Sequence, residues 1–282
     1  MSKIIGVLGA GQMGSGIVQV FAQKGFAVVL FDIAAAQLEK GMKTIAKNLA
    51  RQVEKGTLDE AAVAEIMGRI STTQAFDDLA PCAIAIEAAT ENEQIKFDIF
   101  KKLDALLKPE AILASNTSSI PITRLGAVTS RPDKVIGMHF MNPVPVMKLV
   151  EVIRGIATSD ETFTEISALV TTLGKEMALS ADYPAFIVNR ILMPMINEAV
   201  YALYEGVATA EDIDKGMKLG TNQPMGPLTL ADFIGLDTCL AIMEVIYQGF
   251  KDSKYRPCPL LVKMVEAGYY GRKSGRGFYT YN

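Results

Sequence analysis

The chain has 282 residues, half of them hydrophobic and none of them Trp, with 28 basic and 31 acidic residues and a net charge of −3. This length suffices for two ordinary domains, and the near balance of charge excludes attraction of the whole molecule to nucleic acid. No uncharged apolar run reaches the roughly 18 residues that a membrane span needs, and the N-terminus shows no signal-peptide pattern. The three cysteines form no CxxC pair, so we expect reduced thiols in a cytoplasmic protein without a metal site.

The first half of the chain alternates short apolar runs with helical patterns, which is typical of βα units around a parallel sheet. Helices are expected at residues 11–24, which Gly25 should end, and at about 36–56. Strands are expected at residues 4–8, 27–32, 83–87, 111–115, 135–140 and 148–153.

The pattern changes at a proline turn near residue 183, after which we find helical patterns and no convincing strand. A long apolar helix is expected at residues 186–205, kinked or short of one hydrogen bond at Pro194. A loop rich in Gly and Pro at 218–227 precedes a helix at 230–248. The sequence therefore predicts an α/β fold, with a doubly wound domain at residues 1–183 and an all-helical domain at residues 184–282.

A glycine-rich motif, Gly9-Ala10-Gly11-Gln12-Met13-Gly14, lies between the first expected strand and helix. As an isolated motif it would also fit a structural turn, but its βαβ setting indicates a dinucleotide site and a Rossmann-type domain. Gly9 should form the tight turn, Gly11 should admit the pyrophosphate, and Gly14 should let the helix pack closely. The backbone N–H groups of the first helical turn, which includes Gln12 and Met13, should bind the pyrophosphate.

The second expected strand ends in Asp32, 18 residues after Gly14. We expect its carboxylate to accept hydrogen bonds from the adenosine ribose. That carboxylate would repel a 2′-phosphate, and the residues that follow it, Ile33 and then three alanines, supply no cation. The sequence therefore favours NAD over NADP.

His139 is the only histidine of the chain and lies near the end of an expected strand, where ligands bind in open α/β sheets. A single histidine is more often a packed or surface residue. Oxidation of an alcohol by hydride transfer, however, needs a base with a pKa near neutral. Glu151 interrupts the apolar run of the next strand and is a candidate partner for the imidazole, unless it faces solvent.

The stretches GAGQMG, SNTSSIPIT, GMHFMNPVPVMKLVEV, PAFIVNR and PMGPLTLADFIGLD resemble the L-3-hydroxyacyl-CoA dehydrogenase family, especially its bacterial 3-hydroxybutyryl-CoA members. The resemblance covers essentially the whole chain. It implies NAD-dependent oxidation of a short-chain (S)-3-hydroxyacyl-CoA, and the reverse reduction, within fatty acid and butanoate metabolism. It also implies a homodimer formed through the helical domain. One departure is Ala185, where the family usually has Gly.

The resemblance also implies roles for single residues. His139 would be the general base and Glu151 its orienting partner, while Ser118 and Asn189 would bind the substrate. From the residues alone, Ser118 and Asn189 would equally fit helix caps or turns. The residues that the resemblance places at the nicotinamide end of the cofactor are Glu91, Lys96, Ser118, Asn142 and Lys273.

The helix after Asp32 carries Lys43, Lys47, Arg51 and Lys55 at i, i+4 spacing. Like charges at this spacing repel one another by a few tenths of a kcal/mol per pair. Such a stripe is most often a solvated face, but the resemblance favours binding of the CoA phosphates. We expect Arg51 and Lys55, which lie nearest the turn at Gly56, to hold them.

Two other functions stay open at this stage. One is a dehydrogenase of another 3-hydroxy acid on the same fold, and the other is a non-enzymatic NAD-binding protein. The sequence leaves open the acyl chain length, the physiological direction and the strictness of the preference for NAD.

Overall fold

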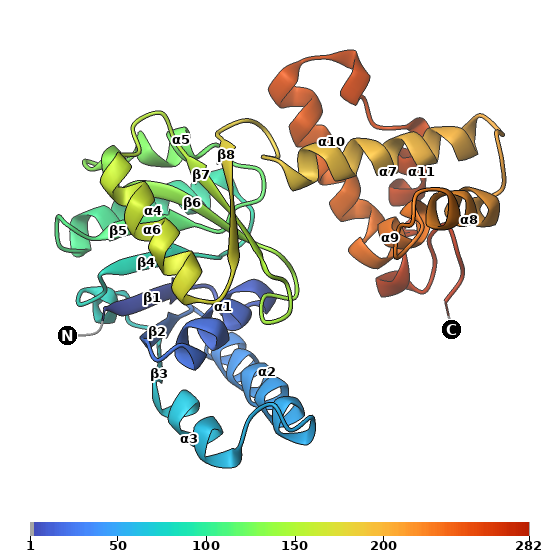
Figure 1. The fold of residues 1–282 in the computed structure, drawn as a ribbon. Helices are drawn as coiled ribbons and strands as arrows, with labels where there is room; N and C mark the ends of the chain where they lie inside the picture. Colours follow the sequence, from blue (N-terminus) through green and yellow to red (C-terminus); the bar gives the residue numbers. More distant parts are fainter. Residues whose placement is uncertain (1–2, 282) are drawn as a thin grey trace. The chain divides into compact units, whose positions relative to one another are not determined.

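The computed structural model describes residues 3–281, and the chain divides into two units with the boundary between Tyr183 and Pro184 (Figure 1). The first unit holds a sheet with helices packed on it, and the second unit is built of helices. The predicted fold class, a doubly wound α/β domain followed by a helical domain, is confirmed.

The sheet of the first unit has the strand order β3-β2-β1-β4-β5-β6-β7-β8. All neighbouring strands are parallel except β6 and β7, which are antiparallel. The order reverses between β1 and β4, and in such sheets ligands bind at the carboxyl ends of the strands beside the reversal. The strands are β1 (Ile4–Leu8), β2 (Ala27–Phe31), β3 (Ile70–Thr73), β4 (Ile84–Glu87), β5 (Ile112–Ser115), β6 (Val135–Phe140), β7 (Leu149–Arg154) and β8 (Glu176–Ala181).

The helices of the first unit connect these strands and bury its main core. Ile17 and Phe21 of α1 pack in one cluster with Ile5 of β1 and Leu30 of β2, all of them fully buried. Every residue of β4, β5 and β6 is buried, because the sheet is covered on both faces. The helices are α1 (Gln12–Gln23), α2 (Ala35–Glu54), α3 (Glu60–Gly68), α4 (Glu93–Leu106), α5 (Ile122–Gly126) and α6 (Asp160–Thr172).

The six predicted strands and the two predicted helices of this unit are present, with ends that differ by one or two residues. Gly25, at φ +88°, ends α1 as expected. Two strands were not predicted, β3 and β8. β8 is an edge strand on which Met177 and Leu179 are exposed, so its sequence lacks the continuous apolar run of a buried strand.

The second unit contains five helices within the described residues and has a core of its own. Pro194 lies inside α7, as predicted. The single helix predicted at residues 230–248 is wrong, because Gly235, at φ +105°, separates two helices there. The helices are α7 (Val188–Tyr204), α8 (Ala210–Gly220), α9 (Pro227–Ile234), α10 (Leu236–Phe250) and α11 (Pro259–Glu266).

The three cysteines, Cys82, Cys239 and Cys258, are buried free thiols, as the sequence predicts. Burial raises the pKa of both Cys82 and Cys239 to about 12, so these two remain protonated at neutral pH. Over residues 3–281, no helix is both long enough and apolar enough to cross a membrane.

Candidate functional site

The glycine motif forms the turn from β1 into α1, at the carboxyl edge of the sheet. Gly9 has φ +103°, and a Cβ there would lie 2.6 Å from the Ala88 carbonyl oxygen. A Cβ on Gly14 would lie 1.8 Å from the Gly9 carbonyl oxygen. Neither position therefore admits a side chain, and the two glycines bring the start of α1 directly against the end of β1.

The N-terminus of α1 meets the requirements of a pyrophosphate site. Gly11 is its N-cap and provides no side-chain cap, so the N–H groups of the first turn, at Gln12, Met13 and Gly14, are available to an anion. A Cβ on Gly11 would meet no protein atom within 4 Å. The space beside Gly11 is thus open, as expected if a ligand and not the fold requires glycine there.

A cavity of about 650 Å³ adjoins this turn and reaches Asp32 at the end of β2. The Asp32 carboxylate accepts hydrogen bonds from the backbone N–H of Ala10 at 2.8 Å and of Ala34 at 2.9 Å. These bonds fix its orientation, and each carboxylate oxygen retains a lone pair for a ribose hydroxyl. The cavity and the glycine turn therefore fit a dinucleotide.

Lys102 of α4 lines the same cavity as Asp32. Its ammonium lies 5.9 Å from the centre of the Phe76 ring, which itself packs edge-on against Phe31. No cation follows Asp32 directly along the chain, and Lys102 is a cation that the fold brings to the same cavity. Lys102 is 70 residues further along the sequence, so only the fold reveals it.

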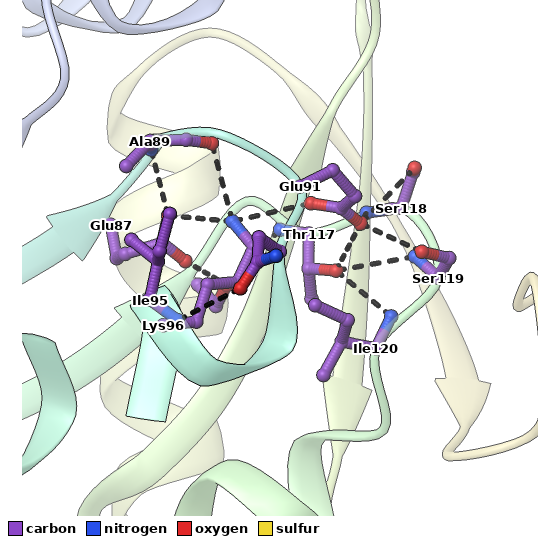
Figure 2. Close-up of polar contacts among 11 residues, drawn as sticks. Glu87, Ala89, Glu91, Ile95, Lys96, Thr117, Ser118, Ser119 and Ile120 are labelled. Atoms are coloured by element: carbon purple, nitrogen blue, oxygen red, sulfur yellow. Dashed lines mark hydrogen bonds and ion pairs between the residues drawn. The ribbon is translucent and has the colours of Figure 1, made fainter. Parts of the chain in front are cut away.

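At the carboxyl ends of β4 and β5, Glu91 holds the Ser-Thr loop that follows β5 (Figure 2). Glu91 Oε1 accepts hydrogen bonds from the Thr117 hydroxyl at 2.5 Å, the Ser119 hydroxyl at 2.8 Å and the Ser118 backbone N–H at 3.0 Å. Its other oxygen, Oε2, lies 3.2 Å from the Lys96 ammonium. The structure thus brings together three of the predicted site residues: Glu91, Lys96 and Ser118.

The charge state of Glu91 follows from these contacts. Burial by itself would raise the pKa of this carboxyl, but the Lys96 ammonium and the hydroxyls of Thr117 and Ser119 outweigh it and lower the pKa. Lys96 is buried and also forms an ion pair of 2.6 Å with Glu87. Its ammonium is therefore engaged by two carboxylates of the protein.

The strands β6 and β7 lie side by side and run antiparallel (Figure 1). His139 of β6 is paired with Glu151 of β7 in their register. Nδ1 of His139 lies 2.7 Å from Oε2 of Glu151, and both side chains are buried. A buried carboxylate at this distance holds the imidazole ring in one orientation. Since β6 is parallel to β1, β4 and β5, the pair lies at the same edge of the sheet as the glycine turn.

The loop from β6 to β7 is fixed at several points. Asn142 accepts a hydrogen bond of 3.1 Å from the amide of Gln12, at the first position of α1. The Lys175 ammonium donates to the carbonyl oxygens of Val144 at 2.7 Å and Met147 at 2.6 Å. The contact with Gln12 links the loop beside His139 to the nucleotide turn, and the contacts with Lys175 link it to the residue before β8.

The remaining predicted residues lie elsewhere. Asn189 is in the first turn of α7 in the second unit, half-buried, and does not cap that helix. Lys273, also in the second unit, forms an ion pair of 2.5 Å with Asp237. Arg51 and Lys55 are exposed at the end of α2 and do not line the hollow of about 310 Å³ on this helix. That hollow is lined by Ala36, Glu39, Lys40, Lys43, Thr44 and Lys47.

Two family models together match nearly the whole chain. Residues 4–183 match the NAD binding domain of 3-hydroxyacyl-CoA dehydrogenase, and residues 186–281 match its C-terminal domain. The chain belongs to the 3-hydroxyacyl-CoA dehydrogenase family. It is an oxidoreductase with NAD as its cofactor, as the sequence predicts.

Relatives of this dehydrogenase match it from end to end. The 3-hydroxybutyryl-CoA dehydrogenase of Bradyrhizobium diazoefficiens is 62% identical over 279 residues, which cover 99% of this chain and 95% of the relative. A probable 3-hydroxybutyryl-CoA dehydrogenase of Bacillus subtilis is 58% identical, with 99% and 97% covered. The crystal structure of (S)-3-hydroxybutyryl-CoA dehydrogenase from Ralstonia eutropha shares 54% identity and a TM-score of 0.97, with all of both chains covered.

Four residues of the candidate site were not predicted from the sequence: Glu87, Lys102, Ser115 and Lys175. Glu87 and Ser115 end two apolar strands. A polar residue at the carboxyl end of a buried strand indicates a site residue, because ligands bind at these ends in open α/β sheets. Lys102 and Lys175 carry no such signal, because only the fold brings them to the site.

Proposed function

We propose that this dehydrogenase oxidises 3-hydroxybutyryl-CoA, a short-chain (S)-3-hydroxyacyl-CoA, to the 3-oxoacyl-CoA and catalyses the reverse reduction. The observation that carries the proposal is the buried pair of His139 and Glu151, 2.7 Å apart at the carboxyl edge of the sheet. Its relatives are named as 3-hydroxybutyryl-CoA dehydrogenases, which supports a short acyl chain in the substrate.

In the proposed mechanism His139 is the general base. With its Nδ1–H donated to the Glu151 carboxylate, Nε2 carries the lone pair that takes the proton of the substrate hydroxyl. Glu151 holds the ring and stabilises the imidazolium that forms. Bound NAD supplies the acceptor for the hydride that leaves carbon 3.

The substrate and the nicotinamide have further proposed contacts. The Ser118 hydroxyl donates a hydrogen bond to the reacting oxygen, and Asn189 is the second residue that we assign to the substrate. The nicotinamide end of the cofactor is assigned to Glu91, Lys96, Ser118, Asn142 and Lys273. Of these, Lys96 acts through Glu91, because its ammonium is buried between two carboxylates.

The two domains have separate proposed tasks. Residues 1–183 bind NAD, and residues 184–282 contribute to substrate binding and form a homodimer. We assign the CoA phosphates to Arg51 and Lys55, at the end of the basic stripe on α2. The proposed location is the cytoplasm.

The test is steady-state turnover with NAD and a series of 3-hydroxyacyl-CoA thioesters from four to sixteen carbons, followed by the absorbance of NADH. A pocket that distinguishes chain length changes its selectivity by about 0.8 kcal/mol per buried methylene. We expect the highest kcat/KM at four carbons. A free 3-hydroxy acid turned over as well as its thioester would instead favour the other dehydrogenase function.

The variant His139→Gln tests the mechanism itself. We expect kcat to fall by about 10² to 10⁴, the usual contribution of a positioned acid or base, with NADH affinity near that of the wild type. Full turnover by this variant would refute the assignment, because the chain has no other histidine.

A further inference from the structure

Glu87, the last residue of β4, is a fully buried carboxylate to which the proposed mechanism gives no part. Its Oε1 accepts hydrogen bonds from the Lys96 ammonium at 2.6 Å and from the Ala89 backbone N–H at 2.7 Å. Its Oε2 accepts a hydrogen bond from the Ser115 hydroxyl at 2.6 Å. One oxygen thus binds the segment after β4, and the other binds the end of β5.

These contacts form a closed ring of five residues. From Glu87, one arm runs through Lys96 to Glu91, whose Oε1 binds the Thr117 hydroxyl (Figure 2). The other arm runs through the Ser115 hydroxyl, which accepts a hydrogen bond of 3.1 Å from the Thr117 backbone N–H. Both arms therefore end on the loop that carries Ser118.

The ring is not needed to hold the strands in register. β4 already pairs with β1 on one side and β5 on the other, and its other residues are apolar and buried. A buried ion pair is costly to desolvate and is weak evidence for stability. A cluster of two carboxylates and one ammonium is therefore better explained by what it orients than by what it stabilises.

We propose that Glu87 is a positioning residue for the reaction, which through Lys96 and Ser115 fixes the Glu91 carboxylate and the loop bearing Ser118. The inference rests on the proposed function, in which Ser118 binds the reacting oxygen and Glu91 lies at the nicotinamide end. Without Glu87, Lys96 pairs with Glu91 alone, and both shift towards each other. The Ser115 hydroxyl then no longer bonds to the end of β4, and the loop that carries Ser118 is held less firmly.

The test compares Glu87→Gln with a matched control, Asp104→Asn. Asp104 lies at the far end of α4 and binds Arg131 and Ser130, so its removal also breaks an ion pair in the same unit. We expect both variants to lower the Tm, whereas only Glu87→Gln lowers kcat, by about 10- to 100-fold, as for misplaced reacting groups. NADH affinity of Glu87→Gln, measured by fluorescence titration, should change less than kcat does.

A second, milder variant keeps the inference testable if Glu87→Gln does not fold. Ser115→Ala deletes one hydroxyl and retains every charge of the ring, and we expect kcat to fall several-fold. In the double variant the losses in kcat should be less than multiplicative, because both changes cut the same path.

The outcomes separate the two proposals. If the wild type turns over 3-hydroxybutyryl-CoA and Glu87→Gln lowers the Tm but not kcat, as Asp104→Asn does, Glu87 has only a structural role and the inference is overturned. If Glu87→Gln does not fold, a wild-type kcat in Ser115→Ala overturns the inference. An inactive wild type overturns the proposed function itself.

Discussion

Replacement of Asp32 by Ser together with Ile33→Arg should convert the cofactor preference from NAD towards NADP. Asp32 lines the cavity beside the glycine turn, and with the adenosine ribose bound at Asp32, as we expect, its carboxylate would face a 2′-phosphate. Ile33 is 83% exposed, so its replacement by Arg removes no packing. The guanidinium would instead supply charge-assisted hydrogen bonds to the phosphate.

The expected loss of stability follows from the hydrogen bonds of Asp32. Asp32 accepts two backbone hydrogen bonds, from Ala10 and Ala34, and a serine hydroxyl can replace at most one. The loss of a bond to a charged group costs about 1.5–3 kcal/mol, which for a unit of this size lowers the Tm by roughly 5–10 °C. A gain of about 3 kcal/mol in phosphate binding corresponds to a shift of about 100-fold in the ratio of kcat/KM values.

The assay is kcat/KM with NAD and with NADP on the same 3-hydroxyacyl-CoA, beside a thermal melt that shows the variant is folded. Lys102→Ala is the matched probe, since Lys102 lines the same cavity. We expect it to spare the reaction with NAD and to lower that with NADP several-fold in the Asp32→Ser, Ile33→Arg background. An unchanged ratio of NAD to NADP in a folded variant would refute the role of Asp32.

Three further predictions address other parts of the chain. Arg51→Ala with Lys55→Ala should raise the KM of the CoA thioester several-fold and leave the KM of the pantetheine thioester unchanged. An equal rise in both KM values would show a structural role. The variant Lys43→Ala with Lys47→Ala, which changes the hollow on α2, serves for comparison. Asp232→Asn should destabilise the second unit by about 2 kcal/mol in a urea melt, because this buried carboxylate accepts from Phe278, Tyr279 and Tyr281; an unchanged midpoint contradicts this. Gly14→Ala should abolish NADH binding in a titration, since its Cβ would overlap the Gly9 carbonyl; wild-type affinity would show that the turn adapts.

The sequence predicted those parts of the fold in which local pattern and burial agree. Strands buried on both faces, such as β4 and β6, read as continuous apolar runs, and the glycine turn has a fixed spacing. The edge strand β8 has neither a continuous apolar run nor a glycine motif, because several of its residues are exposed and need not be apolar. The break at Gly235 was missed because apolar residues continue at helical spacing on both sides of it.

The departure at Ala185 has a structural counterpart. Ala185 adopts φ +66°, the left-handed region, and is completely buried. For a residue other than glycine this conformation costs about 1–2 kcal/mol, so the family's usual Gly is the unstrained residue at this position. The family resemblance in the sequence points to the unusual residue, and only the backbone conformation shows why glycine is suited to this position.

The pairing of His139 with Glu151 depends on the one antiparallel contact in an otherwise parallel sheet. A parallel crossover would need a dozen or more residues, usually a helix, whereas residues 141–148 join β6 to β7 directly. In the resulting register His139 lies opposite Glu151, Phe140 opposite Val150 and Met138 opposite Val152. A slip of one residue would turn the Glu151 side chain to the other face of the sheet. Because both faces of β6 and β7 are buried, such a slip would leave the carboxylate buried without its partner, which is costly. The cost of a buried carboxylate without its partner thus favours the register on which the proposed chemistry depends, and Lys175 and Gln12 hold the loop that joins the two strands.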